Sequence, residues 1–367
     1  MYLGKVIMSG NVIIKDPSGQ EVVRDFETIA PSTMTTVVTF FGSIHNMDCI
    51  FYLLPVLSVS TPATKAGDIK SVRWNNKIRG TDGKFFKNAA FIEMKIDTKD
   101  KLVVPKLSKE KIQMCGSKTM DIIAEAATHI VKHINESVKF IRDVERDRST
   151  FLEAAKWLTE NCRGAPITTL SRYQILGKDI TEQINDNYIV YPSLQSVPPQ
   201  YIYFVNELMR RCDDIKYLSE LNILVEYFSN LKSEWIADKI SIRKIGRSMV
   251  KYNYNIGFKI DKHKLYVLLN MIASNIPPEL SILTKMNMHA EFANLLRSDV
   301  EVEIFSNYDN DDKVIRKNKE TRSKQTFCVR DSGNIMHSGP GGDAMKECYF
   351  VFMNLVRYLR PWISLSN

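Results

Sequence analysis

The chain has 367 residues, which is enough for two domains or for one large pseudo-symmetric domain. Hydrophobic residues make up 44% and charged residues 25%, as in ordinary globular proteins and unlike disordered or fibrous ones. The net charge of +8 permits a polyanionic partner such as nucleic acid but does not require one. No stretch approaches the roughly 18 apolar residues of a membrane span, and the first residues lack the apolar run of a signal peptide, so neither is expected.

The first part of the chain predicts an arm, a strand and a helix. Short strand-like runs between turn residues in 1–31 indicate an N-terminal arm or hairpin. The β-branched and aromatic residues of 32–42 favour a strand. Residues 47–59 are mostly apolar and predict a helix interrupted at Pro55. Residues 60–84 are rich in Lys, Asn and Gly and indicate a loop.

Three strands and a long helix are predicted next. The strands are 88–97, with Ala90, Ile92, Met94 and Ile96 alternating on one side, 101–107 and 112–115. The helix that follows has apolar residues at helical spacing, namely Met120, Ile123, Ala127, Ile130 and Ile134.

Residues 139–245 have a different pattern and predict a helical insertion. Ser149 is a candidate N-cap for a helix over 147–162. After a turn-rich stretch, 200–232 predicts two helices, in which Tyr and Phe recur at a spacing that favours core packing over base stacking.

The second part of the chain repeats the first pattern. A helix is predicted over 261–273, a charged hairpin tip or loop over 309–324, and a final helix that ends near Leu359. The predicted strands are 249–260, 300–308, 325–330 and 334–338. The apolar face of the final helix is expected to contain Met345, Cys348, Tyr349, Phe352, Val356 and Leu359.

An internal repeat constrains the architecture more than any single residue does. The strand, glycine turn and helix of 109–134 return in 331–359, with Gly116 and Gly339 separated by 223 positions (339 − 116). The sequence therefore predicts an α+β fold with two pseudo-symmetric repeats. The predicted domains are an N-terminal arm or hairpin (1–31), a first repeat (32–138), a helical insertion (139–245) and a second repeat (246–367).

The repeated order of strand, helix, several strands and long helix resembles the TATA-box-binding protein family. In that family a strand ends in Ser-Gly-Lys, and an apolar pair and Thr-Gly-Ala-Lys precede the helix. The corresponding stretches here are Lys109-Glu110-Lys111-Ile112-Gln113-Met114-Cys115-Gly116-Ser117-Lys118 and Ser332-Gly333-Asn334-Ile335-Met336-His337-Ser338-Gly339-Pro340-Gly341. The chain is similar in particular to the TATA-binding-like proteins of large cytoplasmic DNA viruses, including in Ser32-Thr33-Met34-Thr35 and the strand at 249–260. The resemblance covers about 32–138 and 246–362.

The resemblance implies a curved antiparallel sheet whose concave face lies on the DNA minor groove. It also implies that the helices are on the convex face, where they recruit a transcription-factor-IIB-like protein and RNA polymerase. Wedge side chains would unstack base steps of A·T-rich duplex DNA. The expected role is viral transcription initiation in the host cytoplasm (viral factory) or after delivery in the virion.

The resemblance also implies a set of DNA-binding residues. The underside of the sheet would contain Met34, Thr36, Val38, Leu107, Gln113, Cys115, Met249, Lys251, Asn253, Cys328, Arg330, Met336 and Ser338. The basic candidates are Lys87, Lys111, Lys118, Arg297 and Arg330.

The sequence departs from the family at its most specific positions. The four wedge phenylalanines are matched by Asn88 (or Ala89), Leu107, Arg297 and Arg330, and two groove-reading asparagines by Met34 and Met249. The carboxylates of Asp299, Glu301 and Glu303 fall on the presumed concave side, where they would oppose phosphate binding. The alternative hypothesis is a non-catalytic structural or protein-interaction protein that keeps the fold without specific DNA binding, with a virion component as one form of it.

Other motifs have both a chemical and a structural interpretation. His129 and His133 at i, i+4 suit a metal but lack the Glu of HExxH, which favours a solvated helix face. His337 before Ser338 is a conceivable base–nucleophile pair without an evident acid. Residues 338–342 resemble a phosphate loop but lack GK[ST], which favours a strand-to-helix turn.

The basic loops 60–87 and 313–324 are either solvated loops or contacts to the edge of the DNA groove. The six cysteines form no CxxC pair, so free thiols in a reducing compartment are expected rather than a zinc site or disulfides. No constellation predicts an enzyme, a cofactor or a metal.

Overall fold

The chain folds into two compact units joined by shared strands. The computed structural model describes residues 13–15, 21–23, 26, 29–81, 89–97, 99–117, 119–162, 166–167, 173–175, 178–180, 186–187, 190–274, 288–293, 299–306 and 323–365. Unit 1 contains residues 1–37, 115–119 and 246–367, and unit 2 contains 38–114 and 120–245. Strands β3, β9 and β14 each run from one unit into the other.

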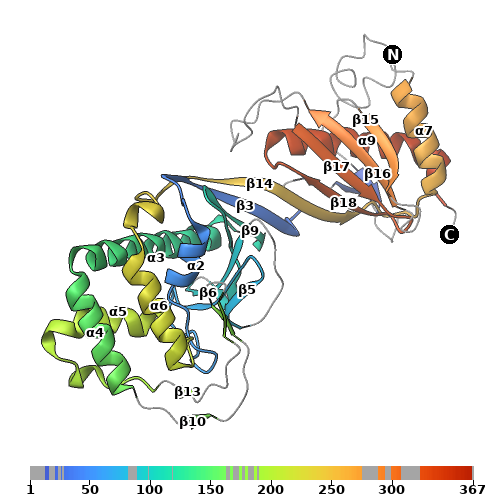
Figure 1. Ribbon diagram of the computed structural model, residues 1–367. Coiled ribbons are helices and arrows are strands. Elements are labelled where there is room, and N and C mark those ends of the chain that lie inside the picture. Colours follow the sequence, from blue (N-terminus) through green and yellow to red (C-terminus); the bar gives the residue numbers. More distant parts are fainter. Residues whose placement is uncertain are drawn as a thin grey trace. The chain divides into compact units, whose positions relative to one another are not determined.

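Within the described residues, unit 1 is an antiparallel sheet with helices packed against it (Figure 1). Its spatial strand order is β15-β16-β17-β18-β14-β3. The strands are β3 (Thr33–Phe41), β14 (Ser241–Asn255), β15 (Met288–Ala293), β16 (Asp299–Ser306), β17 (Ser323–Val329) and β18 (Asn334–Gly339). Helix α7 (Lys262–Ser274) packs against β15, and α9 (Asp343–Ile363) packs against β16 and β17. A separate hairpin pairs β1 (Ile13–Lys15) with β2 (Glu21–Val23).

The core of unit 1 is aromatic. All six residues predicted for the apolar face of the last helix are buried, which confirms that prediction. His337 stacks on Phe327 with ring centroids 4.0 Å apart. Phe26, near the N-terminus, packs on Tyr252 and Tyr349 at centroid distances of 4.8 and 5.1 Å.

Unit 2 combines the other half of the sheet with a group of helices. Its strand order is β3-β9-β8-β6-β4-β5, and β7 also pairs with β6. The strands are β4 (Ile69–Trp74), β5 (Lys77–Gly80), β6 (Ala90–Ile96), β7 (Lys99–Val103), β8 (Lys106–Leu107) and β9 (Lys111–Ser117). The helices are α2 (Met47–Leu53), α3 (Met120–Arg146), α4 (Arg148–Asn161), α5 (Ile202–Arg211) and α6 (Leu218–Asn230).

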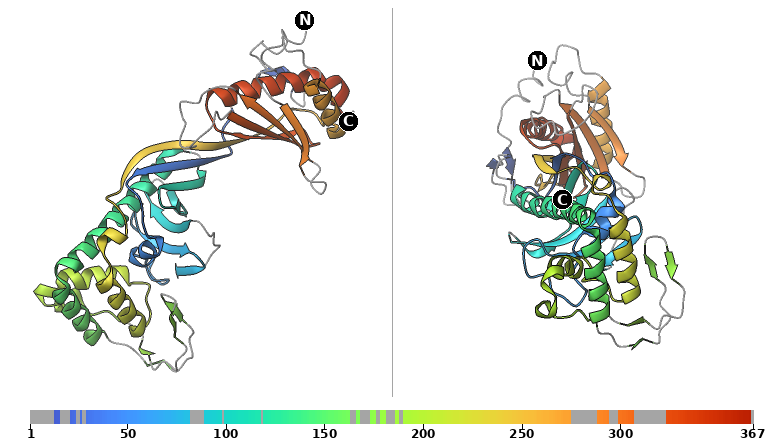
Figure 2. Two further views of the ribbon diagram at one scale, coloured as in Figure 1. Left: turned by 45° about the horizontal axis from the view of Figure 1, so that its top comes forward. Right: turned by 60° about the vertical axis from the view of Figure 1, so that its left-hand side comes forward.

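The insertion shares one hydrophobic core with the first repeat. Buried residues of α4, α5 and α6, such as Phe151, Leu208 and Phe228, belong to the same cluster as Val38 of β3 and Ile92 of β6. Figure 2 shows the three helices grouped at the C-terminal end of α3. Short elements complete this region, namely β10 (Pro166–Ile167), β11 (Tyr173–Ile175), β12 (Lys178–Ile180), β13 (Asp186–Asn187), η2 (Leu194–Ser196), η3 (Pro199–Tyr201) and η4 (Ser233–Trp235). The two helices predicted in 200–232 are confirmed, as is the burial of Phe204 and Phe228.

One element order occurs twice along the chain. Strand β3, helix α2, strands β4, β6, β8 and β9 and helix α3 follow the same order as β14, α7, β15, β16, β17, β18 and α9. Strands β5 and β7 of the first series have no counterpart among the described strands of the second. The spatial orders β3-β9-β8-β6-β4 and β14-β18-β17-β16-β15 match as well. Gly42 and Gly257 follow the first strand of each series with φ of +79° and +86°, a conformation that glycine adopts without strain.

The predicted loop 60–84 instead contains a hairpin, β4–β5. Asn75 and Asn76 connect the two strands with φ of 48° and 63°. Two positive φ values define a type I′ turn, which asparagine tolerates and which matches the twist of paired strands. The Asn-Asn pair was the sequence signal for this turn.

Two predicted elements, the helix 47–59 and the strand 101–107, have different boundaries in the structure because each contains a proline. Helix α2 ends at Leu53, because the residue before Pro55 is driven out of the helical region, so residues 55–59 are not helical. The predicted strand 101–107 is split around Pro105, which has no N–H to donate, into β7 and β8.

Candidate nucleic-acid interface

Three adjacent strands of unit 1 have one face on the core and one face away from it. The core side of β14, β17 and β18 contains the buried residues Val250, Tyr254, Phe327, Ile335 and His337. The residues between them are half-buried or exposed. We call the following set the open face of unit 1: Met249, Lys251, Asn253, Thr326, Cys328, Arg330, Met336 and Ser338. It includes every residue that the resemblance assigned to the underside of the second repeat.

The strand register arranges the open face in two rows. Asn253 lies opposite Met336, and Met336 lies opposite Cys328. Lys251 lies opposite Ser338, which in turn lies opposite Thr326. Cross-strand neighbours of this kind are about 5 Å apart, so each row is a continuous surface.

Both rows continue to an acidic strand. Glu301 is the register partner of Cys328, and Glu303 is the register partner of Thr326. Both rows of the open face are therefore bordered by β16, in which the sequence has acidic residues.

The first repeat departs from the predicted underside. Met34, Thr36, Val38 and Leu107 are 3%, 0%, 0% and 0% exposed. Leu107 pairs with the core residue Ile112, and so it lies on the core side. Its assignment as a DNA wedge is wrong, because it is enclosed by protein.

Strand β3 is buried on both faces, so no choice of register would expose these positions, and the predicted face was also the wrong one. Thr35 Oγ1 donates a hydrogen bond to Cys115 Sγ at 3.5 Å, so Thr35 rather than Thr36 shares a face with Cys115. Every residue from Met34 to Phe40 is apolar or threonine, and hence the sequence shows no alternation here.

Other predicted residues are accessible or lie outside the description. Lys111 and Cys115 are exposed and Gln113 is half-buried. Sequence reasoning missed Lys106, which pairs with Gln113; its position next to Leu107 was the available signal. Residues Asn88, Lys87, Lys118, Arg297 and the loop 309–322 lie outside the described residues.

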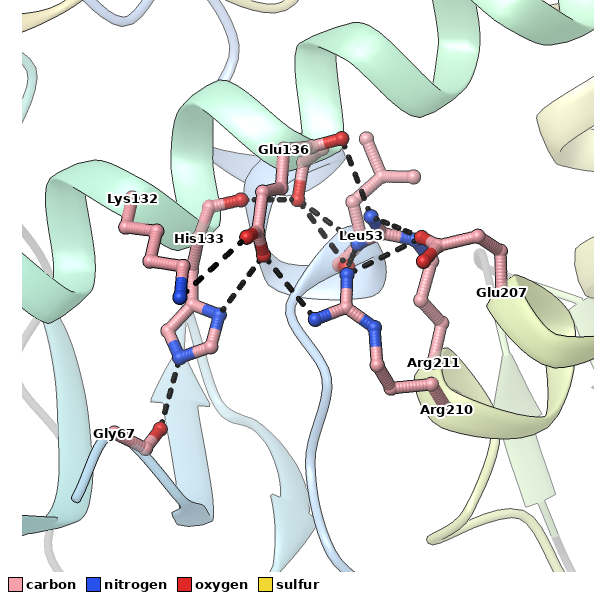
Figure 3. A network of polar contacts seen from close by, with 9 residues as sticks. Leu53, Gly67, Lys132, His133, Glu136, Glu207, Arg210 and Arg211 are labelled. Atoms are coloured by element: carbon pink, nitrogen blue, oxygen red, sulfur yellow. Dashed lines mark hydrogen bonds and ion pairs between the residues drawn. The ribbon is translucent and has the colours of Figure 1, made fainter. Parts of the chain in front are cut away.

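Unit 2 contains a network of buried charges that ties the insertion to the first repeat (Figure 3). Arg211 of α5 is 0% exposed. It donates to the carbonyl of Leu53 in α2, to Ser137 Oγ of α3 at 3.0 Å and to Glu207 at 2.9 Å. Burial lowers the pKa of Arg211 to about 10, so the guanidinium stays charged at neutral pH.

A second buried arginine caps helix α2. Arg79 donates to the carbonyls of Phe51, Tyr52 and Leu54 at 2.8–2.9 Å. It also forms an ion pair with Asp214 at 2.5 Å, in which both side chains are 5% exposed. The pair satisfies carbonyls that would otherwise lack donors at a helix end. These contacts assign the network a structural role.

The predicted solvated face of α3 is wrong at His129 and His133. His133 Nε2 is 2.8 Å from the carbonyl oxygen of Gly67, and a Cβ at Gly67 would lie 2.7 Å from His129 Nδ1. His133 Nδ1 is also 3.7 Å from Glu136. Hydrogen bonding from His133 and Arg210 lowers the pKa of Glu136 to about 2, so this carboxylate is ionised.

The remaining sequence motifs have structural explanations. His337 is buried and Ser338 lies on the opposite face of β18, so they do not form a base–nucleophile pair. Residues 340–342 connect β18 to α9, which confirms the strand-to-helix turn.

None of the six cysteines, all of which are among the described residues, forms a disulfide bond. Within the described ranges, no three His, Cys, Asp or Glu side chains gather as metal ligands. None of the described helices has both the length and the apolar composition needed to cross a membrane.

No known family model matches the chain, and no curated protein shows significant similarity to it.

Proposed function

We propose that the chain is a TATA-binding-protein-like DNA-binding factor that acts in viral transcription initiation. The observation that carries the proposal is the repeated strand order, β3-β9-β8-β6-β4 and β14-β18-β17-β16-β15, with a helix after the first and last strand of each series. This order agrees with two pseudo-symmetric repeats of the family's fold. The site of action would be the host cytoplasm or the virion.

The open face of unit 1 would contact the minor groove of A·T-rich duplex DNA. Lys251 and Arg330 supply charge for phosphates or for a narrow groove. Asn253 and Ser338 supply hydrogen-bonding groups for base edges, and the adjacent Met336 supplies an apolar contact. Helix α9 packs on β16 and β17, and α7 packs on β15 and β16. They would present the surface for a transcription-factor-IIB-like protein and RNA polymerase.

The test is a salt titration of binding to A·T-rich and G·C-rich duplexes, with bending followed by energy transfer between the DNA ends. We expect A·T-preferring binding with a bend. Replacing Lys251 and Arg330 by Gln removes two cations, which should make the slope of log K against log salt shallower by about 1.8. The matched control is Lys259→Gln with Arg357→Gln, two exposed cations of unit 1 outside the open face. An equal effect of both pairs would contradict the proposed interface.

A second function is favoured by the acidic strand. Glu301 and Glu303 are register partners of open-face residues. Carboxylates there suit a basic protein better than DNA. Unselective binding that disappears near physiological salt, together with an unbent duplex, would favour a non-catalytic protein-interaction or structural role.

A further inference from the structure

Three chain segments of unit 2 converge around an exposed phenylalanine. Phe41, at the end of β3, is 58% exposed. The amide of the preceding Phe40 donates to Glu110 O at 3.2 Å, and Ile44 donates to Lys109 O at 2.9 Å. On the other side, the Asp238 amide donates to Ser43 O at 3.0 Å. The stretch after Phe41 is therefore held between the turn at 108–111 and the segment 238–243.

These segments carry several cations, and one of them lies at the aromatic ring. The guanidinium of Arg243 lies 5.5 Å from the centroid of the Phe41 ring. We call the following set the Phe41 edge: Phe41, Lys109, Lys111, Lys239, Arg243 and Lys244. Each of these side chains is exposed except that of Lys244, which is half-buried.

The Phe41 edge has more cations than there are carboxylates next to it in the sequence, namely those of Glu110 and Asp238. Asp238 is already occupied by His45, at 3.1 Å, and by the amide and hydroxyl of Ser43. The described ion pairs of unit 2 use other cations, such as Lys77 and Lys232. Among the described residues, none of these pairs includes a cation of the Phe41 edge.

The conformation of the edge is fixed by the backbone. Gly42 follows Phe41 with φ of +79°, and a Cβ there would lie 2.8 Å from Lys239 O. Only glycine fits this close approach without displacing the segment 238–243. The ring of Phe41 is thus presented to solvent from an ordered turn.

We propose that the Phe41 edge binds unpaired, single-stranded nucleic acid. Sites for single strands combine cations that follow the phosphates with an aromatic ring on which a base stacks. A duplex offers no free base face to Phe41, whereas an unpaired strand does. The inference rests on the proposed function only in that nucleic acid is the ligand, because the edge is outside the open face of unit 1.

The experiment measures binding of the full chain to labelled oligo-dT of about 15 nucleotides, a length within known single-strand site sizes. Phe41→Ala should weaken this binding roughly tenfold or more, and Phe41→Trp should preserve it, because stacking needs a flat ring. Arg243→Gln with Lys239→Gln should reduce the salt slope by about 1.4. The control pair is Lys139→Gln with Arg142→Gln, exposed cations on α3.

Two results would overturn the inference. The first is oligo-dT affinity unchanged by Phe41→Ala. The second is a control pair that weakens binding as much as the edge pair does.

Duplex titrations of the same variants separate the two proposals. Loss of A·T preference with intact, Phe41-dependent oligo-dT binding rejects the duplex function alone. Selective duplex binding with no oligo-dT binding rejects the Phe41 edge alone.

Discussion

The two units share one strand order but are stabilised by different chemistry. Unit 2 buries two arginines, Arg79 and Arg211, whose donors are divided among carbonyls and carboxylates of separate helices. Unit 1 buries stacked aromatic rings around an uncharged imidazole, that of His337. Both cores contain packed aromatic rings, such as those of Phe140 and Phe151 in unit 2, so the buried arginines are what unit 2 adds to the same strand order.

The difference also separates two kinds of surface. In unit 2, the polar contacts of the insertion are directed inward, where they join α2, α3 and α5. In unit 1, the polar residues of β14, β17 and β18 are directed away from the core. The buried polar side chains of unit 2 therefore report on stability, and the polar side chains of the open face report on binding.

The largest expected effect is the loss of a buried charge pair in unit 2. Arg79→Ala leaves Asp214 buried without its partner and removes donors from three α2 carbonyls. We expect a destabilisation of roughly 3–5 kcal/mol. Hydrogen exchange read by mass spectrometry should show it over β6 and α2, with β18 unaffected.

The double variant Arg79→Met with Asp214→Leu is the control for that prediction. It removes both charges together and should recover most of the lost stability, because an apolar pair leaves no unpaired ion. If Arg79→Ala loosens β18 as much as β6, the two units do not unfold separately and the comparison fails.

A pH-dependent loss of stability is expected in unit 1. Burial lowers the pKa of His337 to about 3 from its ordinary value of 6.5, and its ring contacts are with the aromatic residues Phe327, Phe26 and Tyr252. The unfolded chain therefore binds a proton that the folded one excludes between pH 6.5 and 3. Stability is complete above this window and should fall by about 1.4 kcal/mol per pH unit within it.

The measurement is hydrogen exchange over β18 at pH 7, 5 and 4, corrected for the intrinsic exchange rate. His337→Leu should flatten this pH dependence, because it removes the titrating group. A slope that persists in His337→Leu would show that other groups cause the acid sensitivity of unit 1.

The smallest effect concerns the helix after the first strand of unit 2. Asn46 caps α2 by accepting hydrogen bonds from the amides of Asp48 and Cys49 at 2.9 and 3.2 Å. Asn46→Ala should cost about 1 kcal/mol, and Asn46→Asp should cost little because it keeps the acceptor. Urea denaturation of both variants checks the difference, and equal midpoints would mean that the cap does not stabilise α2.

The underside residues that the resemblance implied lie away from the core in the predicted second repeat but are buried in β3. In β18, buried Ile335 and His337 alternate with Asn334, Met336 and Ser338, as the resemblance implied. In β3, threonines and apolar residues occupy every position, and the faces were interchanged. A strand buried on both sides has no periodicity for the sequence to reveal.

The candidate interfaces were predictable to different degrees. The open face of unit 1 follows from which alternate residues of each strand share a face, and the resemblance implied that assignment. The Phe41 edge depends on three segments that are distant in sequence, 40–44, 108–111 and 238–243, and no local pattern brings them together. The arginine network could not be predicted from the sequence either, because its partners are distant in the chain. Arg79 and Asp214, for example, are 135 positions apart.

The contact of Phe26 with Tyr349 has a consequence for how the protein is made. These residues are 323 positions apart in the chain (349 − 26), yet their rings lie 5.1 Å from each other in the core of unit 1. At a synthesis rate of about 5–20 residues per second, the ribosome needs roughly 16–65 s to deliver Tyr349 after Phe26. Unit 2 is complete once Ile245 has been made, whereas Phe26 still lacks Tyr349 at that point. The order of translation therefore favours assembly of unit 2 before that of unit 1.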